Sequence, residues 1–411
     1  MAVPTVNEAP LRVAVAGAGA FGKNHLRVYR ELETAGLGVA LVAAVEPDAA
    51  RAADTASKYS IPVFATVNEL LAADLKLNAA TVAVPTVHHH AVASALLDAG
   101  LDLLVEKPLA ASLAEADDLI RMSEKASAGK GKRILQPGHL ERFNPAVLAI
   151  EPQLRRPMFF ESHRLSVFTP RALDVDVVLD LMIHDLDIVL TFAASPVRGV
   201  RAVGLPILSP KVDIANVRVE FESGCVANFT ASRVSTERVR KLRFFEPRQY
   251  VSIDYARQDL LVIRIDEGAG KTSPAELIAS LPPQVAAMLP PGIAEGITSG
   301  KIDLAKIDPA LIAQFAAMAK IDPALIAQMH AKFTAPAESK AGLSFSKPAV
   351  TPGEPLRLEI LSFLESVRTR REPRVTARQG RNALALALEI QTSMAAHAKR
   401  AGLENFFNPG T

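Results

Sequence analysis

A glycine-rich turn, GAGAFG at residues 17–22, follows the apolar run LRVAVA near the N-terminus. A helical pattern of apolar residues continues over 23–35. In a strand, turn and helix of this kind, Gly17 permits the tight turn and Gly19 lets the backbone approach a pyrophosphate, while Gly22 lets the helix pack on the strand. The segment therefore predicts a dinucleotide-binding turn with the helix N-terminus facing the anion.

The residues after this turn indicate which dinucleotide it binds. The glycine pattern alone would also suit an ordinary loop, so its surroundings matter. The next strand, GVALVAAV, ends in Glu46, roughly 20 residues beyond the turn. A carboxylate there accepts hydrogen bonds from a ribose 2′-OH and repels a 2′-phosphate, so NAD is favoured over NADP. The expected cofactor-binding residues of this region are Gly17, Gly19, Ala20, Phe21, Gly22 and Glu46.

Strand and helix patterns alternate through the rest of the first 137 residues. Helices are expected at 48–58, 67–73, 88–99 and 113–127, and strands near 63 and at 79–85, 102–108 and 133–139. Repeated alternation with nearly continuous apolar strands predicts an α/β fold with a doubly wound parallel sheet, a Rossmann domain over 1–137.

The pattern changes to period-two alternation from residue 157 onward. Successive short strands, with a hairpin turn at 222–224, predict a second, α+β domain with a largely antiparallel open sheet over 138–267 and 350–411. The Ala- and Pro-rich stretch 268–349 shows no strand pattern, and AKIDPALIAQ occurs twice in it, at 305–314 and 319–328. We expect an insert with short helices that start at Asp-Pro.

Composition and charge exclude several classes of protein. The chain has 46 Lys and Arg against 44 Asp and Glu, a formal charge of +2, so it shows no nucleic-acid-binding footprint. No secretory leader or apolar run of membrane-spanning length occurs, which favours a cytoplasmic protein. The single cysteine, Cys225, excludes an internal disulfide. The basic loop near 369–374 is expected to be a solvated surface.

The segment DVDVVLDLMIHDLD at 174–187 combines charge with apolar residues. On a helix, Asp176, Asp180 and His184 fall at i, i+4 and i+8 and would share one face, with Asp187 close by. Such a face could hold a divalent metal, provide a proton-transferring pair, or serve for capping and ion pairs. His88 to His90 cannot converge on one ion, because consecutive helical residues point about 100° apart.

Two short motifs together resemble signatures of the Gfo/Idh/MocA oxidoreductases: Glu106-Lys107-Pro108, which closes the fifth strand, and Asp180-x-x-x-His184. The resemblance implies that Lys107 reaches a substrate hydroxyl, that His184 accepts its proton, and that Asp180 contacts substrate or tunes the imidazole. It implies no catalytic metal, a peptide before Pro108 that is often cis, and a homodimer or homotetramer formed through the open sheet. Further cofactor contacts are then expected from Pro85, Thr86, His89, Glu106 and Lys107.

The segments GHLERFNPAV and ESHRLSVFTPRALDVDVV are similar to the branch of this family that oxidises nucleotide sugars, although the glycines that often precede the aspartate are absent. The branch implies oxidation of a sugar-ring hydroxyl, C3 of UDP-N-acetylglucosamine, on the way to an aminated lipid A precursor, with an aminotransferase as pathway partner. Substrate binding is then expected from Arg142, Asn144, Arg164, Arg171, Asp180 and His184, with His163 nearby.

In the expected mechanism His184 lies between Asp180 and Lys107, which shift its pKa in opposite directions and leave it near neutrality. Three alternatives stay open at this point. They are a metal enzyme built on Asp176, Asp180 and His184, a non-catalytic NAD-binding protein, and an enzyme of the same family acting on an inositol, a free sugar or a diol.

Overall fold

The computed structural model describes residues 9–125, 131–169, 175–266, 342–403 and 406. The chain divides into two compact units, residues 1–262 with 347–411, and residues 263–346. Arg171 and both copies of the expected 14-residue repeat lie outside the described residues.

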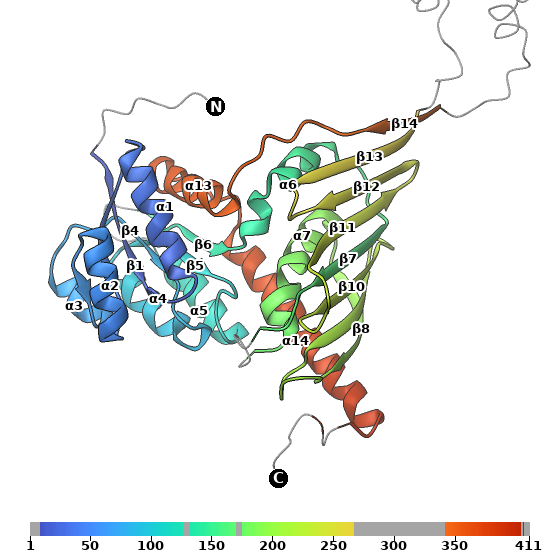
Figure 1. Ribbon diagram of the computed structural model, residues 1–411, viewed down its shortest axis with the longest axis horizontal. Coiled ribbons are helices and arrows are strands. Elements are labelled where there is room, and N and C mark those ends of the chain that lie inside the picture. Colours follow the sequence, from blue (N-terminus) through green and yellow to red (C-terminus); the bar gives the residue numbers. More distant parts are fainter. Residues whose placement is uncertain (1–8, 126–130, 170–174, 267–341, 404–405, 407–411) are drawn as a thin grey trace, which may run out of the picture. The chain divides into compact units, whose positions relative to one another are not determined.

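The N-terminal domain is built on a six-stranded parallel sheet in the order β3-β2-β1-β4-β5-β6 (Figure 1). Its strands are β1 (Leu11–Ala16), β2 (Val39–Val45), β3 (Val63–Phe64), β4 (Ala79–Val82), β5 (Asp102–Glu106) and β6 (Leu135–Gly138). Its helices are α1 (Gly22–Thr34), α2 (Ala49–Tyr59), α3 (Val67–Ala72), η1 (Thr86–His88), α4 (His89–Asp98) and α5 (Leu113–Glu124). The strand order reverses between β1 and β4, and this is where ligands bind in doubly wound sheets.

Two apolar clusters cover the two faces of this sheet. One includes Leu26 and Tyr29 of α1 and Phe363 of the C-terminal helix α13 (Pro355–Thr369). The other includes Leu96 of α4 and Leu119 of α5. Because both faces are covered, β5 is buried along its whole length, as the nearly continuous apolar strand pattern predicts.

The C-terminal part of the first unit is an α+β domain. It begins with η2 (Leu140–Phe143), α6 (Pro145–Ile150) and η3 (Glu151–Gln153), and it contains the π-helical turn η4 (Val178–Met182), α7 (Ile183–Ala193) and α14 (Ala377–Arg400). Its strands are β7 (Phe159–Leu165), β8 (Val197–Leu205), β9 (Ile214–Phe221), β10 (Val226–Ser232), β11 (Val239–Glu246), β12 (Gln249–Asp254) and β13 (Asp259–Asp266). The strand order is β13-β12-β11-β7-β10-β9-β8. Only β7 and β10 pair in parallel among the registers determined for it, which confirms the expected largely antiparallel sheet.

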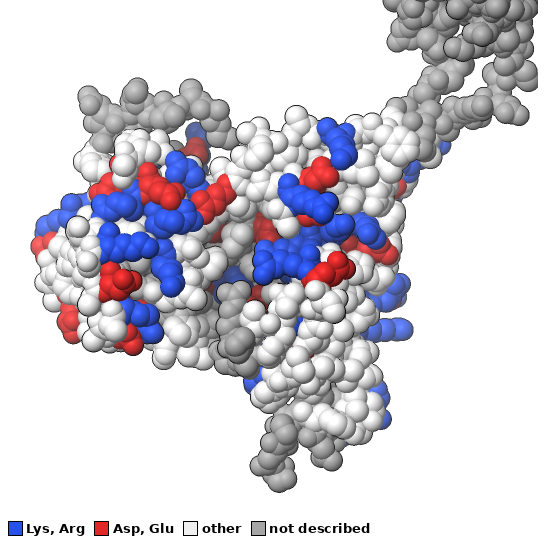
Figure 2. Space-filling model, viewed as in Figure 1, with Lys and Arg blue, Asp and Glu red and all other residues white. Residues whose placement is uncertain are grey.

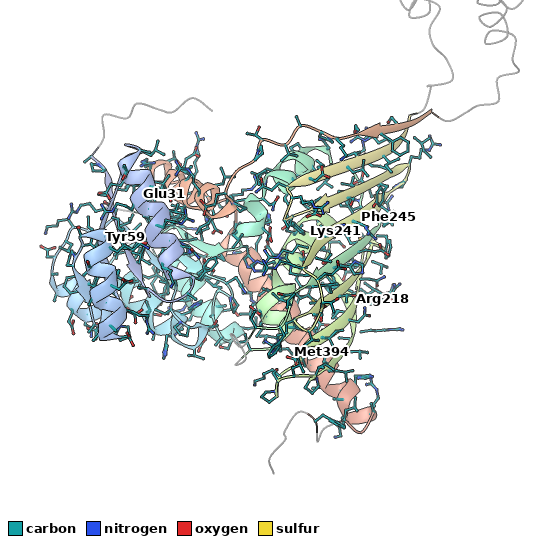
Figure 3. The ribbon with its side chains drawn as sticks, viewed as in Figure 1. Glu31, Tyr59, Arg218, Lys241, Phe245 and Met394 are labelled. Atoms are coloured by element: carbon teal, nitrogen blue, oxygen red, sulfur yellow. The ribbon has the colours of Figure 1, made fainter. Side chains whose placement is uncertain are left out.

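One face of this sheet packs on α7 and α14, with Phe160, Phe244 and Ile390 among the fully buried residues. Burial alternates along β7 and β12, so the other face is open (Figure 1). Figure 3 shows Phe245 and Arg218 on this outer face, away from α7.

The second unit contributes few described residues. They comprise the end of β13 and the strand β14 (Gly342–Ser346), which neighbours β13. The sequence pattern predicts no strand in 268–349, and β14 is an exception to it. Among the described residues, none of the helices combines the length and apolar character needed to cross a membrane.

Candidate active site

The glycine turn joins β1 to α1 and behaves as its spacing predicts. Gly17 has a φ of +95°, and a Cβ there would lie 2.7 Å from the Ala83 carbonyl oxygen. A Cβ on Gly22 would lie 1.9 Å from the Gly17 carbonyl oxygen, so both positions exclude side chains. A Cβ on Gly19 would meet no atom within 4 Å. The open side of the turn is therefore at Gly19, beside the exposed Ala20 and the N-terminus of α1, where a pyrophosphate would approach.

Glu46 lies directly after β2 and is buried beneath this turn. Its Oε2 accepts a hydrogen bond of 3.0 Å from the Ala18 amide, and its Oε1 accepts from the Asp48 amide at 3.0 Å and from Arg51 Nη2 at 2.9 Å. Burial raises the pKa of Glu46, but these hydrogen bonds outweigh it and lower the pKa below the usual value. The carboxylate is thus ionised and fixed at the position expected for a ribose-binding acid, and it also braces the turn.

The loop after β4 carries the next expected cofactor contacts. Pro85 is exposed and Thr86, which begins η1, is half-buried. His89 is only 1% exposed, and its Nδ1 and Nε2 lie 2.8 and 2.9 Å from the carbonyl oxygens of Pro108 and Val84. Burial lowers the pKa of His89, so the neutral ring can donate to only one of these two carbonyl oxygens, and the Nδ1 contact to Pro108 is the one that reaches the loop after β5. The expected contact of His89 with the cofactor stays a prediction.

The loop after β5 has the geometry that the Glu-Lys-Pro motif implies. The Lys107–Pro108 peptide is cis. Glu106 is buried, its Oε1 lies 2.8 Å from Nε2 of the fully buried His25 of α1, and its Oε2 accepts a hydrogen bond of 3.2 Å from the Lys107 amide. Glu106 thus anchors the lysine turn to α1, whereas the sequence placed it among the cofactor contacts.

Lys107 extends from this turn to the α+β domain. Its Nζ donates a hydrogen bond of 2.6 Å to the Asp180 carbonyl oxygen and lies 3.4 Å from the Leu179 carbonyl oxygen and 3.9 Å from Asp180 Oδ1. Burial lowers the pKa of Lys107, although Asp180 and Glu106 oppose the shift. The two motifs, more than 70 positions apart along the chain, therefore meet at one place.

The Asp176 to His184 segment is not the regular helix that its spacing predicts. Its middle forms the π-helical turn η4, and α7 begins only at Ile183. Asp176 Oδ1 caps the segment by accepting from the amides of Val178 and Leu179, at 2.9 and 3.0 Å, and its Oδ2 accepts from Gln391 of α14. The Asp180 amide still donates to the Asp176 carbonyl oxygen at 3.0 Å, with the i to i+4 spacing of a regular helix, and the shared face of Asp176, Asp180 and His184 stays a prediction.

His184 follows η4 and points into a cationic environment. Its Nδ1 is buried without a hydrogen-bond partner. Burial, followed by the charges of Lys107 and Arg164, holds the pKa of His184 well below its usual value. Asp180 does not offset these effects, which corrects the expectation of a pKa near neutrality. The imidazole is therefore a neutral base at physiological pH.

Arg164 and Arg142 hold the α+β domain together from within. Arg164 Nε and Nη2 bind the Asp185 carboxylate at 2.7 and 3.1 Å, and Nη1 binds Glu141 at 3.0 Å. Arg142 Nη1 lies 3.7 Å from Asp187 Oδ1.

These two arginines and Asn144 were expected at the mouth of a substrate site, but they are only 2 to 3% exposed. Asn144 donates to the Tyr255 carbonyl oxygen at 3.0 Å and caps α6 through the Ala146 amide at 3.1 Å. The expectation of exposed anion-binding side chains is therefore wrong for all three.

Two residues near the site carried no recognisable sequence signal. His139 follows β6, is 1% exposed, and has no hydrogen-bond partner at either ring nitrogen. Arg240 of β11 lies opposite Arg164 in the sheet and is half-buried. Burial and Arg164 lower the pKa of Arg240, and its charge contributes to the lowered pKa of His184.

Arg240 is thus a cation whose charge acts on the imidazole. The carboxylates that act on it, Glu141 and Asp185, already bind Arg164. Figure 2 shows a group of Lys and Arg side chains on the visible face of the α+β domain.

Among the described residues, no group of three or more His, Cys, Asp and Glu side chains is placed to hold a metal ion. The side chains present do suit a dinucleotide, because the turn is open at Gly19, an ionised acid follows β2, and Lys107 and His184 lie beyond the carboxyl ends of the strands.

Comparison with known proteins supports the same assignment. Residues 11–130 match the family described as "Oxidoreductase family, NAD-binding Rossmann fold", and residues 147–248 match the "GFO/IDH/MocA C-terminal domain". UDP-N-acetylglucosamine 3-dehydrogenase of Acidithiobacillus ferrooxidans is 34% identical over 261 residues, which are 63% of this chain and 78% of that protein. An inositol 2-dehydrogenase of Acidothermus cellulolyticus is 29% identical over 199 residues, 47% of this chain and 56% of that one.

Solved structures agree. The crystal structure of the Acidithiobacillus ferrooxidans UDP-N-acetylglucosamine 3-dehydrogenase superposes with a TM-score of 0.70 at 26% identity, covering 95% of this chain and 99% of that one. A levoglucosan dehydrogenase in complex with NADH and L-sorbose shares the fold, with a TM-score of 0.68 at 15% identity over 95% of this chain and 98% of that one.

Proposed function

This chain belongs to the Gfo/Idh/MocA oxidoreductases, and we propose that it uses NAD to oxidise a secondary ring hydroxyl of a nucleotide sugar, at C3 of UDP-N-acetylglucosamine. The observation that carries the proposal is that Lys107, in the loop after β5, donates a hydrogen bond to Asp180 in the turn directly before the helix that holds His184. A protein that only bound NAD would not require this pair.

When bound, NAD would supply the acceptor for the hydride of the carbinol carbon. His184 takes the hydroxyl proton, for which its low pKa keeps the imidazole free at neutral pH. The Lys107 ammonium donates a hydrogen bond to the same oxygen as alkoxide character develops and the carbonyl forms. Asp180 holds the ammonium in place through its backbone carbonyl and, at 3.9 Å, through its carboxylate.

The cofactor would be held by the glycine turn, Glu46 and the loop at Pro85 and Thr86. The turn offers an open approach at Gly19 to the amides at the start of α1. Glu46 would bind the adenosine ribose, and its negative charge, fixed by hydrogen bonds, favours NAD over NADP.

The nucleotide-sugar branch is supported by similarity and by charge. The relative that is 34% identical is named UDP-N-acetylglucosamine 3-dehydrogenase, an enzyme that acts on a nucleotide sugar. In this chain, the charge of Arg240 contributes to the lowered pKa of His184, and such a cation could bind a diphosphate. His163 alternates with the buried Arg164 along β7 and so lies on the open face of the sheet. Arg240 therefore takes the role first expected of Arg142 and Arg164.

The proposal extends to assembly and pathway. The outer face of the sheet carries stacked aromatic rings, Phe159 on Phe245 at 5.4 Å and Phe245 on Tyr250 at 5.2 Å, which suits a homodimer or homotetramer in the cytoplasm. A ketone on an amino-sugar nucleotide is a substrate for an aminotransferase, the step that would lead to an aminated lipid A precursor.

The test is incubation of the purified protein with NAD and a panel of UDP-sugars, inositols, free sugars and diols, following NADH absorbance. An aminotransferase with glutamate traps the ketone. We expect kcat/KM for UDP-N-acetylglucosamine to exceed that for any inositol or free sugar at least 100-fold. If an inositol has a higher kcat/KM than UDP-N-acetylglucosamine, the enzyme belongs to another branch of the family. If no compound of the panel is oxidised, a non-catalytic NAD-binding protein is favoured.

A further inference from the structure

A cavity of about 540 Å³ lies at the opposite edge of the Rossmann sheet from Lys107 and His184. It is formed where the end of α5, the segment leading into β6 and the connection from α13 to α14 meet. Lys107 follows the carboxyl end of β5, whereas this cavity opens near the amino ends of β5 and β6. A strand of five residues separates these two edges by about 15 Å.

Four cations line this cavity, namely Lys132, Arg133, Arg370 and Arg378, against two acids, Glu124 and Glu372. Arg370 Nη2 lies 3.1 Å from Oδ1 of Asp102 at the start of β5, and Arg378 Nη2 lies 2.7 Å from Glu124 Oε1. The Arg378 pair is exposed and contributes little to stability. The balance of the lining is therefore positive.

Arg133 is the residue that points to a ligand. It is 9% exposed, and its Nε is buried without a hydrogen-bond partner among the described residues. Its guanidinium lies over Gly100, where a Cβ would come within 3.1 Å of Nη2. A buried N–H donor without an acceptor is costly, and such groups in native structures usually meet an anion or ordered water.

The N-terminus of α14 adds to the positive potential. Thr376 caps this 24-residue helix by accepting from the Gln379 amide at 3.2 Å. Thr376, Ala377 and Arg378 all line the cavity, so the first turn of the helix faces it. A helix N-terminus favours negative charge, particularly that of phosphate groups.

We propose that this cavity binds a phosphate-bearing small molecule, with Arg133 as the central ligand-binding residue and Lys132 and Arg378 at the rim. Arginine binds phosphate through two parallel N–H donors, and the cavity volume suits a metabolite-sized ligand. The basic loop around Arg370, which the sequence indicated as a solvated surface, then forms one wall of this site. The site is separate from the cofactor site and does not depend on which sugar the enzyme oxidises.

The test is a titration of the full-length protein with inorganic phosphate, in saturating NADH so that the glycine turn is occupied. Chloride keeps the ionic strength constant. We expect phosphate to raise the Tm by about 3 °C beyond chloride, and Arg133→Gln to weaken phosphate binding at least tenfold by calorimetry. The double variant Lys132→Gln/Arg378→Gln changes only exposed side chains, so it folds and is expected to show a similar loss.

Arg371→Gln is the matched control, since it removes the same charge next to Arg370 but Arg371 does not line the cavity. It should bind phosphate as the wild type does. The proposal is overturned if phosphate has no effect beyond chloride, or if the double variant and Arg133→Gln bind it with unchanged affinity. NADH binding is measured in the same samples and separates this outcome from a failure of the proposed dehydrogenase activity.

Discussion

At the scale of single residues, the three glycines of the β1–α1 turn have distinct physical roles. Gly17 and Gly22 are required by the packing of the turn on itself and on the loop after β4. Gly19 faces open space. The crowding at Gly22 comes from Gly17 in the same turn and is local in sequence, whereas the crowding at Gly17 comes from Ala83 in a distant loop.

Substitution separates these roles. Gly22→Ala places a Cβ 1.9 Å from a backbone oxygen and is expected to lower the free energy of unfolding by about 3 kcal/mol or more. Gly19→Ala should leave the Tm within about 2 °C but weaken NADH binding at least tenfold, because its Cβ occupies the approach to the pyrophosphate. Gly199→Ala in β8, also without neighbours within 4 Å, is the control and should change neither quantity. Equal effects of Gly19→Ala and Gly199→Ala on NADH binding would contradict this assignment.

Other residues could not be predicted in the same way. Arg164 in β7 and Arg142 in η2 bind Asp185 and Asp187 across 21 and 45 positions. An arginine has the same sequence pattern whether its partner is a ligand or a buried carboxylate. The pKa of His184 likewise depends on burial by distant segments. Sequence motifs therefore predict Lys107, Asp180 and His184 as site residues, but their burial and neighbouring charges follow only from the fold.

At the scale of elements, most helix and strand boundaries agree with those predicted from local sequence patterns. The exceptions depend on tertiary contacts. The Rossmann strands and helices lie within a few residues of their expected positions, because their apolar periods are regular. The π-helical turn η4 has no such signal. Its geometry is held by Asp176, which bonds to Gln391 of α14, a residue more than 200 positions away.

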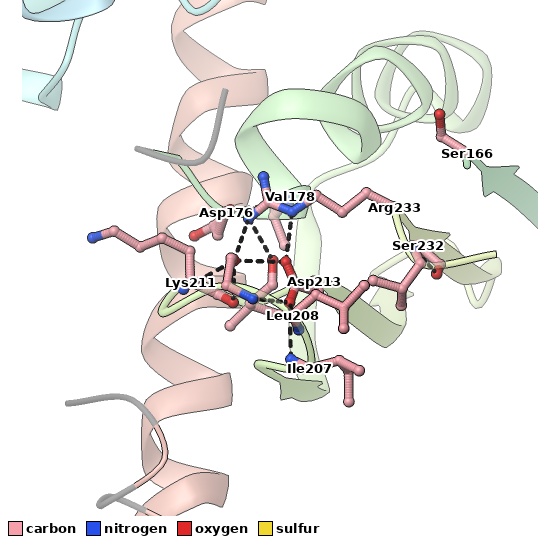
Figure 4. Close-up of polar contacts among 12 residues, drawn as sticks. Ser166, Asp176, Val178, Ile207, Leu208, Lys211, Asp213, Ser232 and Arg233 are labelled. Carbon is pink, nitrogen blue, oxygen red and sulfur yellow. Dashed lines mark hydrogen bonds and ion pairs between the residues drawn. The ribbon is translucent and has the colours of Figure 1, made fainter. Parts of the chain in front are cut away.

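The connection from β8 to β9 is organised by one buried carboxylate, Asp213 (Figure 4). Its Oδ2 accepts from the amides of Ile207, Leu208 and Ser209 at 2.6 to 2.9 Å, and its Oδ1 accepts from Arg233 Nε at 2.7 Å. Burial raises the pKa of Asp213, but these donors outweigh it and lower the pKa from 3.8 to about 2. The folded-state pKa lies below the unfolded one, so this stabilisation is complete above about pH 4 and is lost as the pH falls toward 2.

Asp213→Asn is therefore expected to lower the free energy of unfolding near neutral pH by about 2 kcal/mol, measured by urea denaturation. The difference from the wild type should shrink on acidification below about pH 4. Asp254→Asn is the control, because Asp254 also accepts two loop amides but is partly exposed, and it should cost less than about 1 kcal/mol. A loss for Asp213→Asn no larger than that of the control would show that this carboxylate does not organise the loop.

At the scale of the whole molecule, the proposed function depends on a contact between two domains. The β5 loop of the Rossmann domain carries the Lys107 ammonium, and helix α7 of the α+β domain carries the His184 imidazole. Helices α13 and α14 follow the sheet domain in sequence, yet α13 packs on the first domain and α14 on both α5 and α7. The two C-terminal helices thus connect the two domains. Their packing helps to hold the Lys107 ammonium next to the helix of His184.

The central claim is that His184 is the base of this site and that Lys107 acts on the same oxygen. The most direct measurement is the pH dependence of kcat/KM for UDP-N-acetylglucosamine oxidation. It compares the wild type with His184→Asn and Lys107→Met, and uses His88→Asn as a control at an exposed histidine. NADH affinity is determined in parallel for each protein. The His184 imidazole is unprotonated at pH values above its lowered pKa. In the wild type, the decline of kcat/KM toward acid pH should therefore occur below pH 6.5. The variants should lose about 100-fold to 10,000-fold in kcat while NADH affinity changes less than threefold. If His184→Asn retains more than a tenth of wild-type turnover with the same acid limb, His184 is not the base.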